Sequence, residues 1–378
     1  MELIESLKRN IKNIPGRTIG NRKIVVIYID DFGSIRVKDK RAYQTLKEAG
    51  LNMDGDRYAK WDTLASREDM EILYDALTSV KDQYGHHACM TPFTNVANPD
   101  FERIRESGFT GYYREPFTET LKKYGSAYEG VFELWKQGIA ENIFYPAYHG
   151  TEHLNVIRFM KRLQEGHRST RLAFDNESVC VPRFADEDAF NKDAVVFYIE
   201  DASENVSLKE DIIVGTRMME ELFGYRSKQF TPGAGAYSPD LHGALLDCGI
   251  EYINGERYVA YPMGGGRYSQ QFIYSGKKID NGKQHYIVRN CVFEPSLDDC
   301  STNANATINC LRNIEVAFRW RKPAIISTHR VNFMGTRDAN HRATSIHMLR
   351  ELLSEIVKRW PDVEFMNGDQ MADLMFKK

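Results

Sequence analysis

The sequence lacks cysteine motifs, a strong net charge and long hydrophobic runs, three features that often indicate a function. Its six cysteines, at positions 89, 180, 248, 291, 300 and 310, form no Cys-x-x-Cys pair and no dense framework, so reduced thiols are expected. The net charge is −3 over 378 residues, which provides no basic field for nucleic acid or an anionic membrane. No hydrophobic run reaches the length of a transmembrane helix. We therefore expect no nucleic-acid partner and no membrane span.

A secretory signal is also missing from the N-terminus. Residues 1–10 have the spacing of a short amphipathic helix and lack the apolar core of a signal peptide. Together with the initiator-like Met1, this predicts a cytoplasmic protein; a secreted form with its signal removed is the alternative. Residues 1–22 are expected to form a helical extension before the main domain.

Strand and helix patterns alternate over the rest of the chain. Hydrophobic residues make up 42% and charged residues 27%, which allows a sizeable core and argues against disorder. The first expected strand, at 23–29, is apolar on both faces, as buried parallel strands are. About seven strand–helix units follow one another, which favours a parallel α/β barrel over an open sheet. One domain is therefore predicted over 23–378, with a β-rich insertion near 255–295.

Polar residues stand at the carboxyl ends of four predicted strands. They are Asp30-Asp31, the pair His149 and His153, the turn Thr231-Pro232-Gly233, and His329. In α/β barrels such strand ends converge on one face, where active sites lie. Each feature alone is weak, because an Asp-Asp pair can cap a helix and a single histidine can be a core residue. Their convergence on one face points to metal binding or proton transfer.

The segment His149-Gly150-Thr151-Glu152-His153 is the most informative of the four. Two imidazoles four residues apart can face the same way and bind one divalent metal. The aromatic run at 143–148 predicts a strand before them, and the pattern after them predicts a helix over 152–167. We therefore expect His149 at a strand end and His153 on the first turn of the helix.

The order of these segments resembles that of the polysaccharide deacetylase superfamily, the NodB-like carbohydrate esterases. In that family a strand ends in two aspartates, a later strand ends in H-[ST]-x-x-H, an R-x-P-type turn follows, and a late strand ends in histidine. The matching segments here are Ile29-Asp30-Asp31-Phe32-Gly33, His149 to His153, Phe230-Thr231-Pro232-Gly233 and Ile326-Ser327-Thr328-His329. The resemblance spans roughly residues 23–370 and implies an irregular NodB-like (β/α)7-type barrel with loop and β insertions.

The resemblance also implies a role for each residue. Asp31, His149 and His153 would bind a divalent metal, Zn²⁺ first, with Co²⁺, Ni²⁺ or Fe²⁺ as alternatives. Asp30 would be the general base that activates water, and His329 the general acid that protonates the leaving amine or alkoxide. Further residues expected around the substrate are Pro232, Gly233, Tyr237 with its neighbouring backbone amides, Arg114, Arg330 and Asn332.

Two positions depart from the family pattern. Gly150 stands where the family has Ser or Thr directly after its first histidine. The turn Phe230-Thr231-Pro232 has no arginine, although in the family that arginine orients the catalytic aspartate. Arg114 and Arg330 are the candidate replacements. The chain is therefore predicted to be a divergent metal-dependent hydrolase that removes an acyl group, acetyl first, from an amino sugar or polysaccharide, with the acylated glycan as its partner.

Three other functions stay open on the sequence. The pattern His149-x-x-Glu152-His153 also fits an inverzincin metalloprotease with Glu152 as base, and Glu220 or Glu221 could be its third ligand. That mechanism needs one helix through both histidines, which Pro146 and Gly150 oppose.

A metal-dependent glycosidase on a related barrel is the second alternative. It would need another carboxylate, for which Glu200 or Asp201 is the candidate. The third alternative is a catalytically inactive carbohydrate-binding barrel, which would have no need of the aspartates and histidines that the sequence retains.

Overall fold

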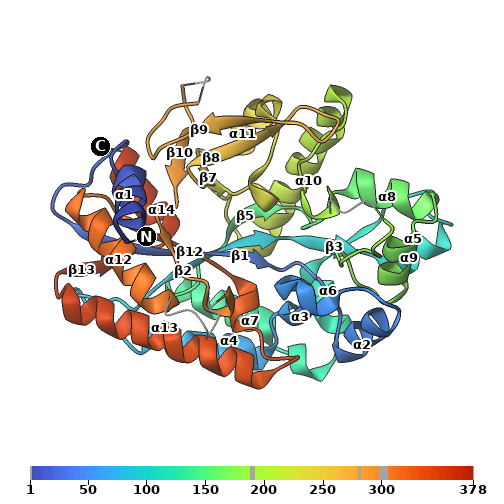
Figure 1. The fold of residues 1–378 in the computed structure, drawn as a ribbon, viewed down its shortest axis with the longest axis horizontal. Helices are drawn as coiled ribbons and strands as arrows, with labels where there is room; N and C mark the ends of the chain where they lie inside the picture. Colours follow the sequence, from blue (N-terminus) through green and yellow to red (C-terminus); the bar gives the residue numbers. More distant parts are fainter. Residues whose placement is uncertain (1, 188–191, 280–281, 298–304, 378) are drawn as a thin grey trace.

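A central parallel sheet surrounded by helices forms the body of the protein (Figure 1). The computed structural model describes residues 2–187, 192–279, 282–297 and 305–377. The strands of this sheet are β1 (Lys23–Phe32), β2 (Met90–Asn95), β5 (Ala147–Gly150), β6 (Gln229–Phe230), β7 (Tyr252–Gly255), β10 (His285–Val288), β11 (Cys291–Val292), β12 (Ala324–His329) and β13 (Val363–Phe365).

The order of the strands shows that the sheet curls into a barrel. It runs β10-β7-β6-β5-β2-β1-β12-β11, with β13 also paired to β1, and all these pairings are parallel. β10 and β11 lie at opposite ends of this order, yet only Arg289 and Asn290 separate them in the chain. The two edges of the sheet therefore meet at these residues. The predicted irregular α/β barrel is confirmed.

Helices cover the barrel, and all of them except α1 follow β1 in the chain. Over the described residues they are α1 (Glu2–Asn13), α2 (Lys40–Glu48), α3 (Arg57–Trp61), α4 (Arg67–Thr78), α5 (Phe101–Glu106), α6 (Phe117–Lys123), α7 (Val131–Ala140), α8 (Val156–Gln164), α9 (Arg168–Asp175), α10 (Asn205–Phe223), α11 (His242–Asp247), α12 (Ala306–Arg319), α13 (Ala339–Arg359) and α14 (Gly368–Phe376). None of them is both long and apolar enough to cross a membrane.

Alternation along β1 separates the barrel interior from the helix-facing side. Ile24, Val26 and Tyr28 pack with one residue from most other strands and with α14, in a cluster enclosed by the barrel. Val25, Ile27 and Ile29 point the other way, into the larger core formed with the surrounding helices. Both faces of β1 are buried, which is why its sequence is apolar throughout.

Helix α14 closes one end of the barrel. Asn367 and Gln370 form a capping box at its start, and Met371 and Met375 project into the interior cluster. Gln229 adds a polar link, because its Oε1 accepts from Tyr28 Oη at 2.8 Å and its Nε2 donates to Asp369 at 3.0 Å.

The segment predicted as a β-rich insertion near 255–295 divides into two parts. Only β8 (Tyr258–Pro262) and β9 (Tyr268–Phe272) form a separate antiparallel hairpin, seen beside α11 in Figure 1. β10 and β11 instead pair in parallel with β7 and β12, as members of the barrel. Residues 195–198 form a turn beside the hairpin. Around it, Glu200 Oε2 and Tyr198 Oη accept from the backbone of Gly265 and Gly266 and fasten the hairpin tip.

A substitution in α14 tests the closed end of the barrel. Met371 is fully buried, so Met371→Ala should leave a cavity and lower the free energy of unfolding by about 2–5 kcal/mol. Leu374 lies on the same helix but is 37% exposed, and Leu374→Ala should cost about 1 kcal/mol or less. Urea unfolding measures both; equal losses would contradict the packing of Met371.

Candidate metal centre

The alternation of each strand continues to the mouth of the barrel. Two residues beyond the inward core positions Tyr28, Ala147, Tyr252, Ile287 and Ile325 stand Asp30, His149, Asn254, Arg289 and Ser327, and β12 then adds His329. All six of these polar residues line one cavity of about 490 Å³. The hairpin covers part of it, since Tyr258, Val259 and Gln270 are also in its wall.

Asp31 joins the cavity through a break in the alternation. Its backbone has φ +76°, in the left-handed region, and the pairing of β1 with β2 shifts register between Ile29 and Phe32. The extra residue lets Asp30 and Asp31 both face the cavity while Phe32 returns to the helix-facing core. A non-glycine residue held this way costs of order 1 kcal/mol, and such strain gathers at functional sites.

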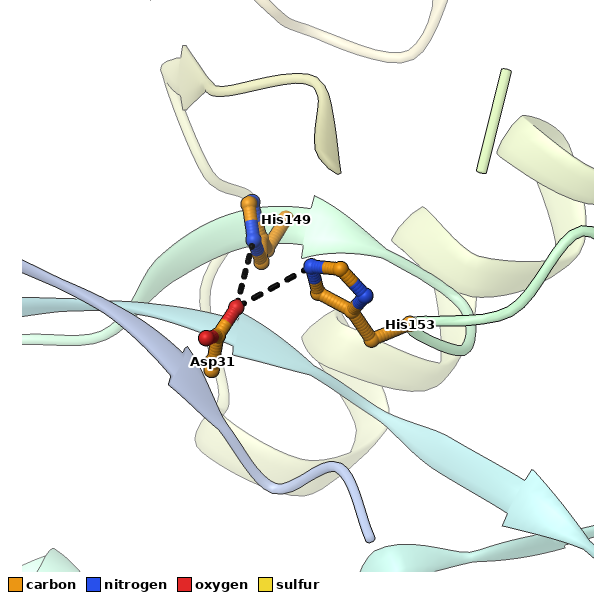
Figure 2. A group of neighbouring side chains, drawn as sticks. All are labelled: Asp31, His149 and His153. Carbon is orange, nitrogen blue, oxygen red and sulfur yellow. Dashed lines mark ion pairs between the residues drawn. The ribbon is translucent and has the colours of Figure 1, made fainter. Parts of the chain in front are cut away.

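Asp31, His149 and His153 form a buried cluster (Figure 2). Asp31 Oδ1 lies 3.4 Å from His149 Nε2 and 3.0 Å from His153 Nε2. The three ligand atoms lie within 4.8 Å of one another, and no residue is more than 6% exposed. Two imidazoles and one carboxylate suit a divalent ion such as Zn²⁺ and leave coordination positions for other ligands. These three residues could therefore hold a metal.

The surroundings of the cluster fit a metal on two counts. His149 Nδ1 donates to the carbonyl of Thr231 at 2.7 Å, which directs Nε2 toward Asp31. Burial raises the pKa of Asp31, but the charge of His153 and hydrogen bonds from both histidines hold it well below the usual range. Asp31 is therefore a carboxylate at neutral pH, as a ligand must be.

The backbone between the two histidines differs from the sequence prediction. α8 begins at Val156 after its N-cap Asn155, so His153 lies in the preceding loop and not on the first helical turn. Gly150 has φ +129°, a conformation that favours glycine. This backbone accounts for Gly150 at a position where the resembled family has Ser or Thr.

The arginine missing from the third segment is supplied by Arg289. Its Nη1 and Nη2 donate to Asp30 Oδ2 and Oδ1 at 2.5 and 2.8 Å, and Nη2 also donates to Thr231 Oγ1 at 2.9 Å. Burial raises the pKa of Asp30, yet the charge and hydrogen bonds of Arg289 keep it below its usual range. Arg289 follows Ile287 by two residues, so strand alternation points both side chains into the barrel. The sequence prediction missed this because it assigned 255–295 to an insertion.

His329 is held by a second residue that the sequence interpretation missed, Glu294. Its Nδ1 lies 2.6 Å from Glu294 Oε1, and its Nε2 lies 3.7 Å from Asp30 Oδ2. Burial lowers the pKa of His329, but the hydrogen bond and charge of Glu294 raise it overall to about 9. Arg57 and Asn332 donate to the other oxygen of Glu294 at 2.6 and 2.9 Å. His329 is therefore protonated at neutral pH.

The two candidate replacement arginines do not reach Asp30, which corrects that prediction. Arg114 donates to Glu152 and Asp211, both at 2.7 Å. Arg330 is fully buried and bound to both oxygens of Asp62. Each is held by another carboxylate and neither lines the cavity.

The other predicted substrate contacts lie at different depths. Pro232 lines the cavity, and a Cβ on Gly233 would stand 3.4 Å from His153 Nε2. The Tyr237 amide donates to the carbonyl of Ala260 at 3.1 Å, and its buried hydroxyl lies 2.9 Å from His242. Tyr237 is therefore bound within the core and does not line this cavity, contrary to the sequence prediction. Asn332 is buried behind Glu294, where it positions that carboxylate, and it is not among the residues that line this cavity.

The geometry also bears on the protease and glycosidase alternatives. No helix runs through His149, which lies in β5, and Glu152 is bound to Arg114, outside the cavity wall. Glu200 pairs with Arg158 at 3.0 Å, and Asp201 accepts from Ser203 at an exposed turn. None of these carboxylates lies where the corresponding mechanism needs it.

Comparisons with known proteins identify the fold. No protein-family model and no curated protein matches the sequence. A probable polysaccharide deacetylase from Pseudomonas aeruginosa PAO1 aligns with a TM-score of 0.50 at 11% identity, covering 95% of this chain and 94% of that one. The chain has the fold of the polysaccharide deacetylases. A putative glycoside hydrolase/deacetylase from Parabacteroides distasonis shares this deacetylase fold, with a TM-score of 0.52, 10% identity and coverage of 95% and 72%.

A longer protein also matches. The chain spans 40% of the length of a 4-alpha-glucanotransferase from Thermococcus litoralis, with a TM-score of 0.43 and 11% identity. At this TM-score the likeness adds nothing to the assignment of the fold.

Separating Arg289 from Asp30 tests the arginine replacement. Arg289→Gln leaves a buried carboxylate without its cation, so the free energy of unfolding should fall by about 3–5 kcal/mol. Adding Asp30→Asn removes the uncompensated charge and should recover about 1–3 kcal/mol of this loss. Urea unfolding of the four proteins in a metal chelator measures the coupling, and strictly additive losses would contradict the pairing.

Proposed function

We propose that the protein is a metal-dependent deacylase that removes an acetyl group from an amino sugar or glycan. The observation that carries the proposal is the meeting of a possible metal site, an ionised carboxylate and a protonated histidine in one cavity. A protein with this fold that is named a probable polysaccharide deacetylase supports the substrate class. A divalent ion, when bound, supplies Lewis acidity that polarises a carbonyl and lowers the pKa of water.

Asp30 is the proton acceptor in this proposal. Arg289 binds both oxygens of Asp30 and keeps it ionised at neutral pH, beside Asp31 of the buried cluster. It can therefore take a proton from the water that attacks the acyl carbon. Arg289 acts through Asp30 and is a positioning residue.

His329 is the proton donor. Glu294 occupies its Nδ1, so Nε2 faces Asp30 across the cavity and carries the proton available for transfer. As the acyl C–N bond breaks, Nε2 donates this proton to the leaving nitrogen, which departs as an amine. Arg57 and Asn332 fix Glu294 and through it the orientation of the imidazole.

Acetate release from acetylated amino sugars, measured with added Zn²⁺, tests the proposal. Asp30→Asn should lower kcat by about 100- to 10,000-fold while the protein still binds one metal ion. His153→Ala should lose both the bound metal and the activity, because it removes a ligand. Asp201→Asn, at an exposed carboxylate outside the cavity, is the control and should leave the rate unchanged. Unchanged acetate release in both Asp30→Asn and His153→Ala would reject the proposal.

The pH dependence of kcat/KM tests His329 separately. Because the protonated form is needed and its pKa is about 9, activity should persist above pH 7 and fall as the pH rises through about 9. Glu294→Gln removes the negative charge that raises the pKa of His329 and leaves at most a neutral acceptor for Nδ1, while burial still lowers the pKa, so the alkaline limb should move to lower pH. Glu294→Asp keeps a carboxylate and should move it less. An alkaline limb that stays in place in Glu294→Gln would contradict His329 as the acid.

A further inference from the structure

Arg36 is a buried cation in the cavity wall that the proposed reaction does not use. It follows Ser34 and Ile35 in the loop after β1 and is 5% exposed. Its Nη2 lies 3.1 Å from His153 Nδ1, and its guanidinium lies over the ring of Tyr58 at 5.4 Å. A guanidinium donates only, so Arg36 presents positive charge to the cavity beside the possible metal site.

The charge of Arg36 is balanced by groups that lie near it without a close ion pair: burial lowers its pKa, but Cys180, Asp31 and Asp62 together raise it. Over the described residues its ion-pair partner is Asp62, whose Oδ2 lies 3.7 Å from Arg36 Nε, beyond hydrogen-bond reach. Both oxygens of Asp62 already accept from Arg330 at 2.9 Å. A buried charge is costly unless a close counter-ion binds it, so this guanidinium suits an anion that comes from outside the chain.

The other carboxylates of the cavity wall have partners of their own. Asp30 is bound by Arg289, Glu256 lies 3.0 Å from Lys12, and Asp56 accepts two backbone N–H groups at the start of α3. Asp31 is the remaining carboxylate in the wall near Arg36, and a divalent ion bound by Asp31, His149 and His153 would neutralise the charge of Asp31. Metal binding would therefore leave Arg36 facing the cavity with less compensation.

We propose that Arg36 binds a carboxylate of the substrate, so that the preferred substrate is an acylated sugar acid and not a neutral amino sugar. This inference rests on the deacylase function proposed above. Guanidinium and carboxylate form strong charge-assisted hydrogen bonds. The ring of Tyr58 also contacts His329 edge-on at 5.8 Å, so one aromatic side chain separates Arg36 from the proposed acid. Arg36 is thus placed to act on the sugar that carries the reacting acyl group.

Two ligands that differ only in the carboxylate test this specificity. N-Acetylglucosamine has a CH₂OH group at C6, whereas 2-acetamido-2-deoxyglucuronic acid has a carboxylate there. Calorimetry on zinc-loaded Asp30→Asn protein measures their binding without turnover. The acid should bind about 10- to 100-fold more tightly than the neutral sugar.

Substitution of Arg36 in the same background identifies the source of the preference. Arg36→Gln should reduce the ratio of the two affinities to about one, and Arg36→Lys should keep part of it because the charge remains. Arg217→Gln removes an exposed arginine of α10 and should leave the ratio unchanged. If Arg36 only supported His153, its loss would weaken both ligands equally and would not change the ratio.

Each outcome decides the inference. A ratio near one before substitution, a ratio that survives Arg36→Gln, or no binding of either sugar at millimolar concentration overturns it. Failure of the proposed function has a different signature, namely no acetate release by the protein with its native Asp30. A carboxylate preference that depends on Arg36 without any acetate release would keep the anion site and reject the deacylase.

Discussion

The ion pair between Arg289 and Asp30 joins the two edges of the barrel to its centre. Asp30 lies near the end of β1, in the middle of the sheet order, and Arg289 stands in the two-residue link between the edge strands β10 and β11. Burying either charge without the other would cost free energy, so the ion pair stabilises the position at which the two sheet edges meet. Arg289 also binds Thr231 and Ser327, each from a different part of the sheet. The closure of the fold and the ionisation of the proposed base therefore depend on one contact.

Strand alternation explains how much of this arrangement could be predicted from the sequence. Asp30, His149 and His329 lie at or within two residues of the carboxyl ends of β1, β5 and β12, so the strand pattern brings those residues to one face. β10 and β11 are four and two residues long and flank a polar pair, a pattern that looks like an insertion. They could be assigned only once their partners β7 and β12 were known, because such short strands are defined by pairing and not by composition.

The parts of the site that could not be predicted depend on long-range pairing or on local backbone strain. Arg114 and Arg330 are as suitable by residue type as Arg289, and the fold brings Glu152 and Asp62 to them instead. Glu294 precedes His329 by 35 residues and meets it because β11 and β12 lie side by side. The left-handed Asp31 leaves no trace in hydrophobic periodicity, and His153 is placed by a loop that ends only at the Asn155 cap.

Asp30 and Asp31 are adjacent in the chain but have different neighbours, which give the two carboxylates different chemistry. Both are buried at the same strand end, and residue type cannot tell a ligand from a base. The register shift turns them to different partners: both oxygens of Asp30 accept from a guanidinium, whereas Asp31 faces two imidazole nitrogens. A carboxylate held on both oxygens by arginine is a poor metal ligand, while one between imidazoles completes a coordination set. Environment therefore supplies the distinction between the two, as it does wherever neighbouring carboxylates take separate roles.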